Sequence, residues 1–193
     1  KAANTLKVPV VLDPVGAVAT SMRTESAKRI LDEVSVAVVK GNSAEISTLA
    51  GSRGEIRGVE AVGDSSSVLD EAVKLADEYH HIAVVSGATD IVTDGKRVAY
   101  VENGHPMMGT ITGTGCMLTS VVACCAAVEK DHFTASVAAL TAFGLAGELA
   151  AAKPGVRGPA SFKTCFFDEL YSLTSEKLKN DARYRILVLD EVE

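Results

Sequence analysis

The stretch GTITGTGCML, residues 109–118, decides the fold, because its glycine-threonine loop runs directly into an apolar helix. Gly113 and Gly115 let the backbone bend so that successive N–H groups converge on one point, and the N-terminus of the helix adds positive partial charge. Such a loop can hold an anion such as a phosphoryl group. It is not a Walker A loop, since no Lys-Ser/Thr follows, and its glycine spacing differs from the dinucleotide fingerprint. The alternative is an ordinary turn that only starts a helix.

Cys116 lies in the first turn of that helix, directly after the last glycine. A helix N-terminus favours an anionic side chain, so a thiolate here could take a proton from an alcohol that attacks phosphorus. Cys116 is therefore the candidate catalytic base. The alternative is a small buried side chain, the common fate of a free cysteine, and by that rule Cys124, Cys125 and Cys165 belong to the core.

Outward from the loop, apolar runs closed by polar or turn residues predict buried strands at 8–16, 35–41 and 81–87. A hairpin is predicted around Asp94-Gly95 and an edge strand within 183–192. The polar, glycine- and serine-rich residues 51–67 are expected to form a loop. Apolar residues at helical spacing predict the following helices: 24–34 with Thr24 as N-cap, 43–51, 67–79, 114–128, 133–152 and part of 158–174.

This order of elements predicts an α/β protein with a three-layer α/β/α fold and a mostly parallel central sheet. Ligands of such sheets bind beyond the carboxyl ends of the strands. The polar segments DPVG, KGN, SGATD and the glycine loop all fall there, so we expect them to form one rim.

Several side chains on this rim suit phosphate chemistry. Asn42 and Glu45 can share one side of a first helical turn, where Glu45 could hold Mg²⁺ through water, but Asn-x-x-Glu also fits a capping box, the better-supported alternative. Asp13 ends a strand and either points into the rim or forms a turn with Pro14. Arg23 either binds a polyphosphate or is solvated, and Ser86 lines a nucleotide loop or simply ends a strand.

The composition excludes several classes of protein. The chain has 193 residues and a formal net charge of −6, with scattered basic residues, which argues against a nucleic-acid binder. No CxxC pair is present, so a zinc or redox site is not expected, and the unpaired cysteines favour a reducing cytoplasm. The apolar run 134–152 contains Glu148, which favours a buried helix over a membrane span.

Together these stretches resemble the hydroxyethylthiazole kinase family of the ribokinase-like superfamily. TGTGCMLTSVVA is the most specific, because ribokinase-like kinases usually carry Asp where these kinases carry Cys116. The other matching segments are VVLDPVGAVATSMRTE, VVKGNSAEI and SGATDIVTDGKRVAYVENGH.

The resemblance implies ATP- and Mg²⁺-dependent phosphorylation of the primary alcohol of 4-methyl-5-(2-hydroxyethyl)thiazole, a step toward thiamine. It implies that Cys116 is the base and that Gly113 contacts the thiazole. For the nucleotide and metal we expect these residues: Arg23, Ser86, Asn42 and Gly115 at ATP, and Glu45 and Asp13 at the metal.

The resemblance further implies a homotrimer with sites at subunit interfaces. Residues 1–193 correspond to one ribokinase-like kinase domain without the N-terminal third of the family pattern, so we expect no turnover from this chain by itself. Two departures are Ser86, where relatives usually carry Thr, and Val18 in GAVAT, where GAGAT is more usual.

Two other functions stay open on sequence alone. One is another ribokinase-like enzyme, a hydroxymethylpyrimidine kinase or a repair enzyme for hydrated NAD(P)H, which Cys116 disfavours. The other is a non-catalytic remnant that serves as a binding or assembly module.

Overall fold

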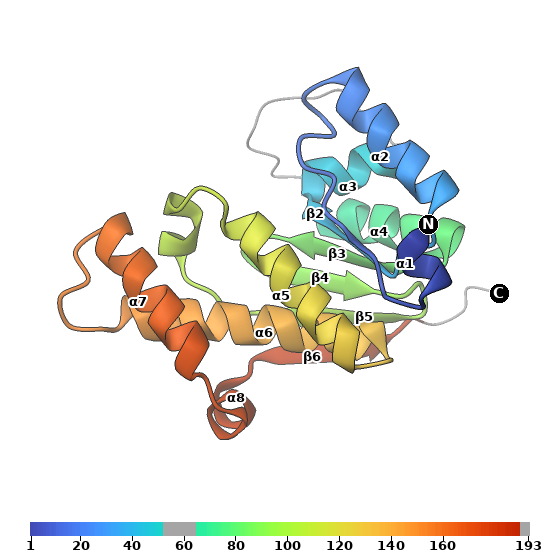
Figure 1. Cartoon of the computed structure of the whole chain (residues 1–193). Helices are drawn as coiled ribbons and strands as arrows, with labels where there is room; N and C mark the ends of the chain where they lie inside the picture. Colours follow the sequence, from blue (N-terminus) through green and yellow to red (C-terminus); the bar gives the residue numbers. More distant parts are fainter. Residues whose placement is uncertain (52–64, 190–193) are drawn as a thin grey trace.

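A computed structural model describes residues 1–51 and 65–189, which fold around a six-stranded sheet in the order β1-β2-β3-β4-β5-β6 (Figure 1). β1, β2 and β3 are parallel, and each later neighbour pair is antiparallel. β5 therefore runs in the direction of β1–β3, so most strands share one direction. The strands are β1 (Val11–Leu12), β2 (Val38–Asn42), β3 (Ile82–Ser86), β4 (Asp90–Thr93), β5 (Arg97–Val101) and β6 (Tyr184–Val188).

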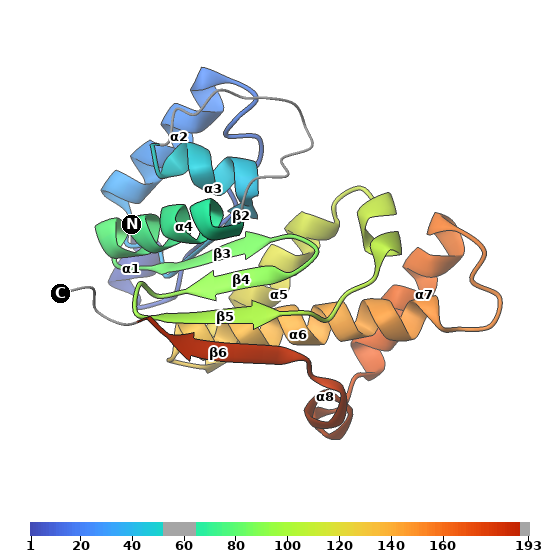
Figure 2. The ribbon, with the colours of Figure 1, turned by 180° about the vertical axis from the view of Figure 1, so that it is seen from behind.

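Helices cover both faces of this sheet, which confirms the three-layer α/β/α fold (Figures 1 and 2). One face carries α2 (Ser21–Glu33), α3 (Ser43–Leu49) and α4 (Ser65–Tyr79). The other carries α5 (Thr114–Val128) and α6 (His132–Ala151), with α7 (Pro159–Ser172) packed on α6. The short elements are α1 (Ala2–Thr5), α8 (Ser175–Asp181) and the 3-10 helix η1 (Pro106–Thr110).

The alternation of side chains along the central strands divides the core in two. On β2, Val38 packs with the α5–α7 layer, whereas the next residue, Val39, packs with the α2–α4 layer. Both are fully buried. Because successive side chains of a strand point to opposite faces, a strand covered on both sides reads as one continuous apolar run. This explains why the run at 35–41 lacks polar alternation.

α6 is the one described helix that is long and apolar enough to cross a membrane, and most of it is buried inside the protein. Its acid, Glu148, accepts hydrogen bonds from Arg183 Nη2 and Gly104 N, both at 2.6 Å. Burial raises the pKa of Glu148, but these bonds outweigh it and hold the pKa below its usual value. The interpretation of this run as a buried core helix is confirmed.

The expected α2 cap at Thr24 is wrong. The N-cap is Thr20, whose Oγ1 accepts from Arg23 N, and Thr24 instead donates its hydroxyl to the carbonyl of Ala17. A Ser/Thr hydroxyl can bond to several nearby backbone groups, so residue type alone leaves the cap position open.

Other boundaries of helices and strands also differ from the predicted ones. Of the run 8–16, only Val11 and Leu12 pair as a strand. Residues 65–67, expected to belong to the loop, begin α4, whereas residues 52–64 lie outside the described part. The hairpin, with Gly95 at φ +89°, and the edge strand β6 are confirmed.

The expectation for the cysteines is wrong at one position. Cys124 is exposed on α5, whereas Cys125 and Cys165 are partly buried against the core. α5 is apolar on nearly all sides, so composition did not show which of its faces is left uncovered.

Candidate active site

Four segments meet at the carboxyl ends of the parallel strands, as expected from the order of elements. Asn42 at the end of β2 lies in register with Ser86 at the end of β3. Asp13, directly after β1, accepts a hydrogen bond from Thr119 of α5, with 2.6 Å between Thr119 Oγ1 and Asp13 Oδ2. The glycine loop at the start of α5 therefore lies on the same rim as the strand ends.

The glycine loop has the bend that the sequence predicted. Gly113 is the N-cap of α5 with φ +93°, a left-handed conformation that disfavours any residue with a side chain. Thr114 Oγ1 donates within the loop to the carbonyls of Met108 and Ile111. The hydroxyl is thus used to shape the turn, and the N–H of Thr114 donates to the Ile111 carbonyl at 3.4 Å. The N–H groups of Gly115 and Cys116 are among those that a helix leaves without internal partners, so they are the ones that can meet a ligand.

Cys116 lies exposed in that first turn. Its thiol is therefore not a small core side chain, which removes the packing alternative. Ser120, one turn later, donates to the Cys116 carbonyl at 3.2 Å, a bond that engages only the backbone of Cys116. The arrangement leaves the thiol accessible beside the loop.

The Asn42–Glu45 pair forms a capping box at the start of α3. Asn42 Oδ1 accepts from Glu45 N, and Glu45 Oε2 accepts from Asn42 N, each at 2.9 Å. The capping alternative is thus confirmed. The other oxygen, Glu45 Oε1, accepts from Gly16 N at 2.9 Å, so the same carboxylate ties the DPVG loop to α3.

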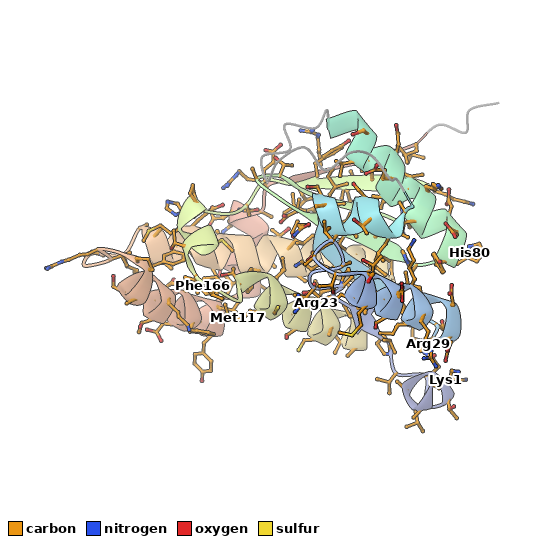
Figure 3. All side chains as sticks on the ribbon, turned by 90° about the horizontal axis from the view of Figure 1, so that it is seen from above. Lys1, Arg23, Arg29, His80, Met117 and Phe166 are labelled. Carbon is orange, nitrogen blue, oxygen red and sulfur yellow. The ribbon has the colours of Figure 1, made fainter. Side chains whose placement is uncertain are left out.

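Arg23 reaches the same DPVG loop from the first turn of α2. Gly16 has φ +70°, and a Cβ there would collide with Arg23 Nη1. Figure 3 shows Arg23 at the end of α2 nearest to α5. The guanidinium therefore lies against the backbone that Glu45 holds, although the side chain of Arg23 as a whole is exposed, as the solvated alternative has it.

A pocket of about 530 Å³ opens beside the rim. Ser86 and Gly115 line it, together with Asp90, His105 and Phe143. Asp90 Oδ1 accepts from Gly87 N at 2.8 Å. Burial raises the pKa of Asp90 to about 6, against the hydrogen bond from Gly87 and the charge of Lys40. The other expected site residues do not line this pocket: Asp13, Arg23, Asn42, Glu45, Gly113 and Cys116.

The family comparison agrees with this geometry. Residues 1–176 match the description "Hydroxyethylthiazole kinase family". The chain belongs to the hydroxyethylthiazole kinase family.

Curated relatives in the family are similar over most of this chain. A hydroxyethylthiazole kinase from Thermoanaerobacter pseudethanolicus is 60% identical over 95% of this chain and 69% of its own length. One from Methanocella arvoryzae is 50% identical over 95% of this chain and 68% of its own length. A solved structure titled as a hydroxyethylthiazole kinase protein from Pyrococcus horikoshii OT3 aligns with a TM-score of 0.81 and 36% identity, covering 96% of this chain and 68% of that one.

Kinases of this kind are expected to need Mg²⁺, and the donor atoms at the rim decide whether the site fits this ion. Asp13 and Glu45 both supply carboxylate oxygens at the rim, and an oxygen that accepts one hydrogen bond keeps a second lone pair. Within residues 1–51 and 65–189, no group of three or more His, Cys, Asp or Glu could hold a metal directly. The donors thus fit a magnesium ion that keeps most of its waters.

Sequence reasoning missed three residues at the rim and pocket: Lys40, Asp90 and His105. Lys40 carried a usable signal, since a lysine within an apolar run expected to be buried on both faces needs a partner. Asp90 belongs to the SGATD segment that the sequence placed on the rim, although it was not named as a site residue. His105 carried no signal, because only the packing of η1 against α6 places it in the pocket.

Proposed function

We propose that this chain carries the phosphotransferase site of a hydroxyethylthiazole kinase, which transfers the terminal phosphoryl group of ATP to the primary alcohol of 4-methyl-5-(2-hydroxyethyl)thiazole in thiamine biosynthesis or salvage. The observation that supports this best is the left-handed glycine turn at Gly113, followed by an exposed Cys116, at the carboxyl ends of the parallel strands. The 60% identity to a relative of that name points to the same substrate.

The chemistry needs little from the protein beyond positioning and charge neutralisation. In our proposal, the N–H groups of the loop and the helix dipole hold the phosphoryl group, and Gly113 contacts the thiazole. The thiolate of Cys116 takes the hydroxyl proton and becomes the thiol as the alcohol oxygen bonds to phosphorus, and the bond between that phosphorus and the departing ADP oxygen breaks. A base of this kind contributes roughly 10²- to 10⁴-fold in rate.

The nucleotide lies along the rim in this proposal. Ser86 and Gly115 contact it from the pocket, whose volume of about 530 Å³ suits a nucleoside-sized group. Asn42 and Arg23 approach from the neighbouring strand end and from α2. Glu45 and Asp13 hold the Mg²⁺ that accompanies ATP, through its waters, and the ion supplies charge neutralisation on the phosphates.

We also propose a cytoplasmic homotrimer with sites at subunit interfaces. Large apolar side chains on α5 and α7 are exposed, among them Val128 at 86% and Tyr171 at 94%. Apolar surface of this kind often marks an interface.

The test is an ATP-dependent phosphorylation assay of residues 1–193, alone and fused to the part of the Thermoanaerobacter pseudethanolicus relative that this chain does not match. We expect the fusion to phosphorylate the thiazole alcohol and not hydroxymethylpyrimidine. Preference for the pyrimidine alcohol would favour the other ribokinase-like kinase. Absence of ATP binding by calorimetry with Mg²⁺ present, in both forms, would favour a non-catalytic module.

A further inference from the structure

Glu148 is the only acidic residue of α6, and the proposed function assigns it no role. Its Oε1 accepts hydrogen bonds from Gly104 N and from Arg183 Nη2, each at 2.6 Å, and its Oε2 accepts from Arg183 Nη1 at 3.0 Å. Two parallel bonds between a guanidinium and a carboxylate fix the orientation of both groups. Arg183 directly precedes β6, which lies beside β5 in Figure 2, so three segments meet at one carboxylate.

Asn103 joins the same cluster from the segment that follows β5. Its side chain is buried. Its Nδ2 donates to Glu148 Oε1 at 3.3 Å and to the Asp181 carbonyl at 3.1 Å, and its Oδ1 accepts from Arg183 N at 2.7 Å. A buried amide whose donors and acceptor are all bonded is held in one orientation. We call Asn103, Glu148 and Arg183 the clamp.

The clamp lies at one wall of the pocket that the proposed function gives to the nucleotide. Asn103, Gly104 and His105 line that pocket. Glu148 and Arg183 line a different hollow, of about 480 Å³, between α6 and α8. These two side chains therefore hold the main chain of the wall from outside the nucleotide pocket.

Stability alone is a poor explanation for this arrangement. The Arg183 side chain is 51% exposed, and ion pairs with an exposed partner contribute little to the free energy of unfolding. Packing already fixes Asn103, because its carbonyl lies so close to α6 that a Cβ on Gly144 would collide with it. The clamp adds a defined position for the next residues, Gly104 and His105, which face the pocket.

We propose that Glu148 is a positioning residue for nucleotide binding, which together with Arg183 fixes the main chain of residues 103–105 as one wall of the pocket. This rests on the proposed function. A wall that is held in place before binding need not be ordered by the ligand, so the ligand binds more tightly. The effect falls on ATP more than on the transfer step, since Gly113 and Cys116 belong to the glycine loop and do not line this pocket.

The binding test compares Glu148→Gln with a matched control, Glu169→Gln. Glutamine keeps the size of the side chain but has one acceptor oxygen and no charge, so it cannot serve Gly104 and both Arg183 nitrogens. Glu169 of α7 is also paired, with Lys153 Nζ at 2.7 Å, and its side chain is 15% exposed against 21% for Glu148.

Both variants are made in the fusion protein described above. We expect Glu148→Gln to raise the Kd for ATP, measured by calorimetry with Mg²⁺, by roughly 5- to 30-fold. The KM for the thiazole alcohol and kcat at saturating ATP should change by less than about twofold. Glu169→Gln keeps the wild-type Kd for ATP.

Arg183→Met tests whether the two side chains act together. It removes the guanidinium and leaves Glu148 able to accept from Gly104, so we expect a smaller increase in the Kd for ATP than in Glu148→Gln. The double variant should bind ATP about as weakly as Glu148→Gln alone, because both substitutions disturb one set of contacts. Increases that multiply in the double variant would refute a shared clamp.

A wild-type Kd for ATP in a folded Glu148→Gln protein would overturn the proposal. An equal loss of affinity in Glu169→Gln, or an equal rise in the KM for the thiazole alcohol, would also overturn it, because either result indicates a general structural effect. If Glu148→Gln does not fold, Arg183→Met decides: a raised Kd for ATP supports the clamp, and an unchanged Kd refutes it.

Hydrogen exchange needs neither ATP nor turnover, so it separates this proposal from the proposed function. In residues 1–193, the amides of 102–108 should exchange faster in Glu148→Gln than in the wild type, and at the wild-type rate in Glu169→Gln. Unchanged exchange in Glu148→Gln would refute the clamp even in an active kinase. A fusion protein that binds no ATP, with the exchange difference present, would remove the nucleotide function and leave the clamp as a structural device only.

Discussion

At the scale of single residues, the most informative feature is a thiol on the surface of an apolar helix. Cys116 is exposed although free cysteines are usually buried, and it lies beside the only residue of its loop that has a left-handed backbone, Gly113. An exposed side chain makes few packing contacts. Substitutions at residue 116 should therefore report on chemistry rather than on folding.

Replacing Cys116 tests its role as base. We expect Cys116→Ala to lower kcat by roughly 10²- to 10⁴-fold and Cys116→Asp, which supplies a carboxylate base, to retain or raise turnover. Both should unfold within about 0.5 kcal/mol of the wild type, as is usual for exposed positions. Steady-state kinetics and urea denaturation are the measurements. Inactive Cys116→Asp with normal stability would argue against general-base catalysis at this position.

At the scale of elements, the carboxylate of Glu45 connects the end of β2, the start of α3 and the DPVG loop. Glu45 closes the capping box of α3 at the end of β2 and also holds the DPVG loop through Gly16. The structural role needs two acceptor oxygens or their equivalent, whereas a role toward Mg²⁺ needs the negative charge. Substitutions can separate the two.

Glu45→Gln keeps one amide oxygen for the capping box, since Gln also serves at this position, but its NH2 group cannot accept from Gly16 N. We expect it to cost about 1 kcal/mol in unfolding free energy, for the lost Gly16 bond, and to weaken the dependence of kcat on Mg²⁺. Glu45→Ala loses both bonds, at about 2 kcal/mol. Magnesium titrations of activity with chemical denaturation distinguish these outcomes; equal Mg²⁺ dependence in wild type and Glu45→Gln would remove Glu45 from the metal site.

The contact of α6 with the end of β5 is a second test at this scale. A methyl group on Gly144 would collide with the backbone carbonyl of Asn103, whereas one on Gly147 would meet only the flexible side chain of Met108. Backbone cannot yield as a side chain can, so we expect Gly144→Ala to cost about 1–3 kcal/mol and Gly147→Ala clearly less. Urea unfolding of both variants is the measurement, and equal costs would contradict it.

At the scale of the whole molecule, buried His81 and partly buried Asp90 give the free energy of unfolding opposite dependences on pH. Burial lowers the pKa of His81 to about 4, and neither ring nitrogen has a hydrogen-bond partner in the described part of the chain. Burial raises the pKa of Asp90 to about 6. The contribution of neutral His81 to the free energy of unfolding is complete above about pH 6.5 and is lost as the pH falls toward 4. The stability tied to protonated Asp90 is present at low pH and is lost as the pH rises through about 6.

These two dependences oppose each other between about pH 6 and 4, each at roughly 1.4 kcal/mol per pH unit at most. We expect His81→Phe to become more stable on going from pH 7 to pH 5, and Asp90→Asn to become less stable. His80→Gln, at an exposed position, is the control and keeps the wild-type profile. Unfolding free energies at the two pH values test this; parallel profiles for His81→Phe and Asp90→Asn would contradict it.

The sequence predicts best those features that depend on residues close together along the chain. The hairpin at Asp94-Gly95, the helix at 114–128 and the strands β2 and β3 follow from turn residues and apolar periodicity, which act between near neighbours. The N-cap of α2 was misplaced because Thr20 and Thr24 both have plausible hydroxyls, and the fold selected one of them. The cluster of strand-end loops was predictable from topology alone.

The sequence by itself determined the α/β class, the elements and the glycine turn that ends in Cys116, because these depend on contacts within a few residues. Only the tertiary structure decided that Lys40 reaches Gly115, 75 residues away, that Thr119 bonds to Asp13 across 106 residues, and that Glu45 holds Gly16. Such contacts depend on how complete layers pack. Local periodicity carries no information on them, because many pairings of side chains are compatible with the same pattern of elements.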